Sequence, residues 1–120
     1  MDVEGFRNYC LAKKAVTEEL PFGPDVLVFK VMGKMFALGA LESLPFRVSL
    51  KCDPERAIAL RDEHPDHIEG AYHMNKKHWN SLEIEMLPPQ LVLDLIEHSY
   101  DLVVQSLPKK LQQELDNLQS

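Results

Sequence analysis

The sequence is poor in cysteine, in long apolar runs and in basic charge, and each shortage narrows the class of protein. Cys10 and Cys52 are the only cysteines among 120 residues, too few for a secreted fold stapled by disulfides. No basic segment followed by an apolar run marks a signal peptide, and the apolar runs are too short to span a bilayer. We therefore expect reduced thiols, a cytoplasmic location, no membrane partner and one domain over residues 1–120.

Sequence patterns of enzymes and metal sites are also missing. The pairs His64/His67 and His73/His78 have no second cysteine or histidine pair at ligand spacing, although carboxylate ligands stay open. Residues 32–34 contain a single glycine and precede no helix, which indicates a hairpin turn instead of a phosphate loop. We expect no catalytic residue, no metal and no cofactor, and hence a protein that is not an enzyme.

Two apparent nucleophilic sites have simpler interpretations. Cys52 follows Lys51 and precedes a helix start, a position that can lower the pKa of a thiol. Strand alternation nevertheless directs Cys52 into the core, where a thiol packs as a small apolar side chain. Residues 98–101 contain histidine, serine and aspartate, but consecutive helical residues point in different directions and cannot form a triad.

Charge is unevenly distributed along the chain. The net charge of -6 argues against bulk binding of nucleic acid. Residues 82–120 carry two basic against seven acidic side chains, which accounts for five of the six excess negative charges. Two other stretches, 26–52 and 71–81, hold six basic side chains against Glu42 alone: Lys30, Lys34, Arg47, Lys51, Lys76 and Lys77. A fold that joins these stretches would give an acidic protein a basic face.

Hydrophobic periodicity predicts an α+β fold with two layers. Period-two patterns and turn residues predict strands over residues 16–20, 26–31, 35–41, 47–52 and 79–85, with an irregular segment over 66–75. Helical spacing and caps predict helices between Asp2 and Lys13, between Asp53 and Pro65, between Pro89 and Pro108, and over 109–118. The order is helix, four strands, helix, strand, helix, helix. Short connections imply an antiparallel sheet of about five strands with helices packed on one face.

The uncovered face of this sheet is the predicted binding surface. Alternation places Arg47, Ser49 and Lys51 on that face, with Lys30 and Trp79 beside them. The stretch AYHMNKKHWN, Ala71–Asn80, contributes further polar and cationic side chains. The complete predicted set is Lys30, Arg47, Lys51, His73, Asn75, Lys76, Lys77, His78 and Trp79.

Cations around an aromatic ring suit a surface that follows a nucleic-acid backbone and stacks its bases. The same set would suit another anionic ligand, such as a small molecule or an acidic peptide. A third interpretation is a solvated sheet face beside a structural loop, in which His73, Asn75, His78 and Asn80 bond to the backbone. Binding and scaffold roles can coexist in this segment.

The order and spacing of several segments resemble those of the MmcQ/YjbR family over nearly the whole chain. The segments are FGPDVLVFKVMGKMFAL, RVSLKCDPERA, YHMNKKHWN, LIEHSYDLVV and LPKK. The resemblance implies a curved antiparallel sheet, similar to type III secretion chaperones, with two wing-like hairpins and a DNA-binding-like label. The family's H-x-N-K-x-H-W segment corresponds to His73, Asn75, Lys76, His78 and Trp79. The resemblance implies no catalytic residue.

Two functions follow as hypotheses. The first is a binding protein for nucleic acid, DNA above all, that uses the basic sheet face and the Ala71–Asn80 loop. The alternative is a protein-interaction or chaperone-like module, which could form a homodimer through an apolar patch or a free strand edge. That patch would consist of Val104, Leu107, Leu111 and Leu115.

Overall fold

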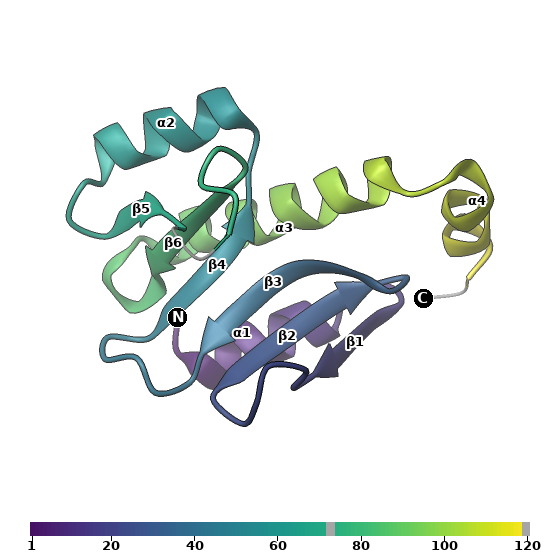
Figure 1. Ribbon diagram of the computed structural model, residues 1–120, viewed down its shortest axis with the longest axis horizontal. Coiled ribbons are helices and arrows are strands. Elements are labelled where there is room, and N and C mark those ends of the chain that lie inside the picture. The colour runs from purple at the N-terminus through teal and green to yellow at the C-terminus, as the bar shows by residue number, and fades with distance from the viewer. Residues whose placement is uncertain (72–73, 119–120) are drawn as a thin grey trace.

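The chain folds into one antiparallel sheet with helices against a single face (Figure 1). The computed structural model describes residues 1–71 and 74–118. Within them the sheet has six strands in the order β1-β2-β3-β4-β6-β5. The strands are β1 (Val16–Glu19), β2 (Val26–Val31), β3 (Lys34–Ala40), β4 (Arg47–Lys51), β5 (Ile68–Gly70) and β6 (Trp79–Glu83). The helices are α1 (Val3–Leu11), α2 (Pro54–Glu63), α3 (Pro89–Ser106) and α4 (Lys109–Asn117), with a short 3-10 turn η1 (Ile84–Met86).

The predicted α+β class and the helix positions are confirmed, whereas the expected strand count is low by one. β5 lies in the segment expected to be irregular, and it pairs Ile68 with Leu82 and Gly70 with Asn80. Three residues are too few to show an alternating pattern, so only pairing with β6 reveals this strand. The strand expected over 79–85 ends at Glu83, where the chain turns into η1.

Local capping signals explain where the first two helices begin. The Asp2 carboxylate accepts a hydrogen bond from the Gly5 amide at 2.8 Å and caps α1. The Asp53 carboxylate accepts from the Arg56 amide at 3.2 Å, and Pro54 occupies the first turn of α2. An acidic cap followed by proline needs no tertiary contact to start a helix, which is why the sequence predicted this boundary.

All four helices contribute to one core on the same side of the sheet. Phe6 of α1, Leu60 of α2, Leu95 of α3 and Leu115 of α4 belong to a single buried cluster with the inward strand residues. The opposite face carries none of the described helices and stays open. No helix in the described ranges is long and apolar enough to cross a membrane.

Of the four residues in the apolar patch expected on the C-terminal helices, two are buried, whereas Val104 and Leu111 are half-buried. Leu107 and Leu115 are each 4 % exposed, and both belong to the interior. The chain turns after Pro108, so α4 folds back and its Asp116 carbonyl accepts from the Lys14 ammonium at 3.4 Å. Leu115 of α4 therefore contributes to the chain's own core.

Ser99 connects the long helix to two strands, and its loss should be costly. The fully buried Ser99 hydroxyl donates to the Phe36 carbonyl at 2.6 Å and accepts from the Lys51 amide at 2.9 Å. Because Ser99→Ala leaves both backbone groups without this partner, we expect it to lower the free energy of unfolding by about 1–3 kcal/mol. Urea denaturation would measure the loss.

A second serine on α3 provides the matched control. The Ser106 hydroxyl donates to the Val103 carbonyl at 2.7 Å and accepts from the Lys34 ammonium at 3.1 Å, but Ser106 is exposed and water can replace both bonds. We therefore expect Ser106→Ala to change the free energy of unfolding by no more than about 0.5 kcal/mol. Equal losses for the two variants would contradict a bridging role for Ser99.

Candidate ligand-binding site

The open sheet face contains the strand residues that alternation assigned to it. β4 pairs with β6 so that Ser49 lies opposite Ser81 and Lys51 lies opposite Trp79. Arg47 begins the same row of side chains, opposite Glu83. Lys30 lies on β2 and is separated from β4 by β3. The predicted shared face is therefore present, with Lys30 at some distance from the others.

Acidic side chains compensate the guanidinium of this face. Arg47 forms ion pairs with Glu83 at 3.1 Å and with Glu69 at 3.5 Å. Glu83 also contacts the His67 Nδ1 atom at 3.0 Å. The hydrogen bonds from His67 and from Arg47 hold the pKa of Glu83 below its ordinary value. Arg47 is thus engaged by two carboxylates, and this end of the face is not basic.

Lys30 is compensated in the same way, by an acid on the neighbouring strand. Its ammonium lies 3.3 Å from the Glu19 carboxylate of β1. Lys51 is half-buried, and its backbone amide is bonded to Ser99. Two of the six basic residues, Lys30 and Arg47, are therefore paired with acids on this face, which lowers its positive charge.

The loop between β5 and β6 is held by its own backbone and by one asparagine. The Asn75 carbonyl accepts from the amides of His78 at 3.0 Å and Trp79 at 2.9 Å, and its side-chain oxygen accepts from the Lys77 amide at 3.0 Å. The Ala71 amide donates to the Trp79 carbonyl at 3.0 Å. These bonds support the scaffold role that the sequence suggested for Asn75.

Of two other residues predicted to support the loop, the structure describes Asn80 but not His73. Asn80 is 2 % exposed, and its side-chain amide donates to the Ala57 carbonyl of α2 at 3.3 Å. This bond ties α2 to β6. His73 lies outside the described residues, so its predicted role stays a prediction.

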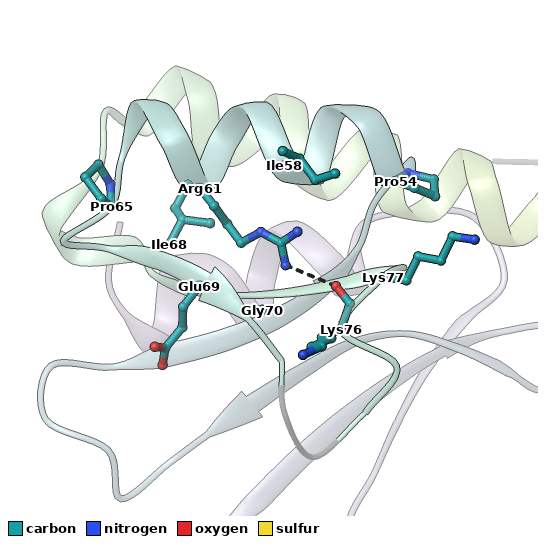
Figure 2. Close-up of a pocket in the computed structure, with 9 residues that line it drawn as sticks. All are labelled: Pro54, Ile58, Arg61, Pro65, Ile68, Glu69, Gly70, Lys76 and Lys77. Carbon is teal, nitrogen blue, oxygen red and sulfur yellow. Dashed lines mark hydrogen bonds between the residues drawn. The ribbon is translucent and has the colours of Figure 1, made fainter.

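Lys76 and Lys77 line a pocket between the loop and α2. Figure 2 shows the pocket, which has a volume of about 530 Å³. Arg61 extends from α2 toward the loop and donates to the Lys76 carbonyl at 3.2 Å, drawn as a dashed line in Figure 2. The lining residues are Pro54, Ile58, Arg61, Pro65, Ile68, Glu69, Gly70, Lys76 and Lys77.

Gly70 allows this close approach of helix and loop. A Cβ atom at position 70 would lie 2.8 Å from an Arg61 guanidinium nitrogen and 3.1 Å from the Lys76 Cβ atom. Both distances are shorter than ordinary van der Waals contact, so a larger residue would push Arg61 away from the loop. The glycine thus allows Arg61 of α2 to lie beside Lys76 of the loop.

Positive charge predominates in the lining of this pocket. Among its described lining residues, Arg61, Lys76 and Lys77 are cations and Glu69 is the one carboxylate. No sequence pattern marks Arg61 as a site residue, because the acidic residues Asp62 and Glu63 follow it, as is typical of a solvated helix face. Only the packing of α2 beside the loop reveals its place in the site.

The structure separates the predicted lysines from the predicted aromatic ring. Trp79 and Asn75 line a groove on the open sheet face, together with Arg47. Lys76 and Lys77 line the pocket beside α2. The two hollows share Glu69 and Gly70 of β5. The loop thus divides its side chains between two sites, instead of gathering them on one surface.

The other reactive side chains are buried or used in structure. Burial raises the pKa of the Cys52 thiol to about 11 and that of the Cys10 thiol to about 12. The His98 imidazole accepts from the Asp53 amide at 3.1 Å, and burial lowers its pKa. Among residues 1–71 and 74–118, no group of three histidine, cysteine, aspartate or glutamate side chains could hold a metal. The packing interpretation of Cys52 therefore agrees with the structure.

Comparison with known proteins places the chain among bacterial relatives. The YjbR family model matches residues 11–102. The chain is 44% identical over 92 residues to the uncharacterised protein YbdF of Escherichia coli O157:H7, covering 75% of this chain and 74% of the relative. It is 31% identical over 112 residues to the uncharacterised protein YjbR of Escherichia coli K12, covering 92% and 93%.

Solved structures share the fold over most of its length. The crystal structure of Deinococcus radiodurans DR2400, a DUF419 domain, has a TM-score of 0.88 and 38% sequence identity, covering 96% of this chain and 88% of that one. A Pseudomonas syringae protein has a TM-score of 0.73 and 28% identity, covering 85% and 98%. The resemblance noted in the sequence motifs is therefore confirmed, and the chain belongs to the YjbR family.

Proposed function

We propose that this chain is a non-enzymatic binding protein that holds a phosphate-bearing ligand, above all single-stranded nucleic acid, in the pocket between α2 and the Lys76–Lys77 loop. The observation that carries the proposal is the presence of three cations, from α2 and from the loop, around one pocket. Guanidinium and ammonium groups are the side chains that bind phosphate most strongly.

The rest of the lining favours a nucleotide over a bare anion. Pro54, Ile58 and Pro65 add apolar surface beside the cations, and Ile58 is 54 % exposed. An apolar wall next to a cation suits the sugar and base of an unstacked nucleotide. The net charge of -6 opposes a broad duplex contact, so we place single strands before double-stranded DNA.

The family resemblance implies DNA binding through wing-like hairpins, and we include this in the proposal. The β2–β3 hairpin turn would then make an additional contact with DNA, since Lys34 at its end is exposed. A cytoplasmic location, where such a ligand occurs, is supported by the buried, unpaired thiols of Cys10 and Cys52.

A titration of labelled oligonucleotides tests the proposal. Fluorescence anisotropy would compare single-stranded DNA, RNA and a DNA hairpin duplex. Three phosphate contacts on a single strand predict a fall in affinity of about twentyfold between about 50 and about 200 mM salt. Saturable binding with this dependence is the expected result. Equal affinity at both salt concentrations, or no binding at the lower one, would overturn it.

An exposed apolar rim favours the alternative of a protein-interaction module. Phe22 is 66 % exposed and Leu44 is 95 % exposed, and their loops are joined by the Leu41 amide, which donates to the Asp25 carbonyl at 2.8 Å. If the oligonucleotides fail to bind and the protein self-associates in sedimentation, this rim becomes the preferred site. Phe22→Ser would then restore the monomer.

A further inference from the structure

We propose that the groove on the open sheet face is a second ligand site, which takes an uncharged, flat apolar molecule bearing one hydroxyl or amide group. The groove has a volume of about 730 Å³, within the range of small-molecule sites. It lies on the other side of the loop from the cationic pocket, and it does not depend on the function proposed for that pocket.

The floor of the groove changes from apolar to hydroxyl-bearing across the sheet. Leu38 of β3 lies opposite Ser49 of β4, which in turn lies opposite Ser81 of β6. Val26 and Ala40 form a neighbouring apolar pair at the end of β2 and β3. A flat molecule bound here would contact the aliphatic side chains of Val26, Leu38 and Ala40 on one side. On the other side it would contact the hydroxyls of Ser49 and Ser81.

Aromatic side chains bound the groove at its two ends. Trp79 is half-buried on β6, and Phe22 stands in the turn before β2 with 66 % of its surface exposed. Because all four helices pack on the opposite face, none of the described elements covers this apolar surface. A ligand with apolar faces would bury the exposed surface of both Trp79 and Leu38, and this burial favours binding.

Charge complementarity selects an uncharged occupant. Arg47 is the one cation among the described lining residues, and it is engaged by Glu69 and Glu83. A ligand carboxylate would have to displace Glu69 from Arg47, and a ligand ammonium would have to displace Arg47 from Glu69, so either ion gains a partner only by breaking an existing ion pair. A charged group placed here without a partner would lose its hydration, and no ion pair would offset that free-energy cost.

Neutral hydrogen-bonding groups remain available. The Ser49 and Ser81 hydroxyls are 3.4 Å apart, a long contact that leaves both able to donate to and accept from a ligand. These two hydroxyls, together with the adjacent apolar row, define the ligand class.

Three matched naphthalene probes test the charge preference. The single tryptophan gives one indole N–H signal in a ¹H–¹⁵N NMR spectrum, and it lies in the groove. We expect 1-naphthalenemethanol to shift this signal to saturation with an affinity about tenfold tighter than that of 1-naphthylmethylamine or 1-naphthoate. Tighter binding of either ion, or an unmoved indole signal with all three probes, would overturn the proposal.

Variants locate the binding within the groove. Leu38→Glu places a carboxylate on the half-buried floor and should weaken binding of the alcohol by more than about tenfold. Should this variant fail to fold, Ser49→Ala with Ser81→Ala removes both hydroxyls and should bring the affinity for the alcohol down to that for 1-methylnaphthalene.

Lys77→Gln, in the other pocket, should leave the titration unchanged. Loss of binding in Lys77→Gln alone would assign the probe to the cationic pocket and refute the groove.

Discussion

Replacing both Lys76 and Lys77 with glutamine is expected to weaken the binding of single-stranded DNA by about 60-fold at about 50 mM salt. Each phosphate contact releases about 0.7 counterions from the DNA, so losing one contact lowers the binding constant by nearly a factor of ten at that salt concentration. The slope of log affinity against log salt should also become shallower by about 1.4. Anisotropy titrations at several salt concentrations would measure both quantities.

The design keeps the loop itself intact. The Lys77 contact with the Asn75 side chain uses the backbone amide, which glutamine retains. Arg61 donates to the backbone carbonyl of Lys76, which the substitution also leaves in place. The double substitution therefore retains both backbone contacts of the loop.

The chain supplies its own control for the lysine variant. Lys109 and Lys110 form another pair of adjacent lysines, both exposed on α4. Replacing them with glutamine changes the net charge by the same amount away from the pocket. If this control loses as much affinity, binding follows the total charge of the protein and the proposed pocket is not its site.

Phe6→Ala is the substitution with the largest expected effect on stability, a loss of about 3–5 kcal/mol in the free energy of unfolding. Phe6 is 1 % exposed, and its ring packs edge-on against Phe29 at 5.5 Å and against Phe46 at 5.8 Å between ring centres. Truncation would leave a cavity where α1 meets β2 and the β3–β4 connection. Urea denaturation followed by circular dichroism would measure the loss.

Phe22→Ala is the matched control for this effect. The Phe22 ring is mostly exposed in the turn before β2, so its removal should change the free energy of unfolding by no more than about 0.5 kcal/mol. A similar loss in both variants would mean that the aromatic cluster around Phe6 is not the centre of the core.

The sequence by itself determined the elements whose signals are local. Asp53 followed by Pro54 starts a helix through a side chain and a ring that act within one turn. Alternation in β4 separated the buried Val48 and Leu50 from Arg47, because a strand points successive side chains to opposite faces. These signals were sufficient for the α+β class and for the residues that share the open face.

Only the tertiary structure decided which charges meet. Arg47 pairs with Glu69 and Glu83, which lie far along the chain and approach it only because β4, β6 and β5 are neighbours in the sheet. Arg61 and Lys76 approach in the same way, once α2 packs beside the loop over Gly70. Ion pairs of this kind depend on the order of strands and on the docking of helices. Neither leaves a periodic pattern in the sequence, so the predicted basic face was divided by contacts that no local signal encodes.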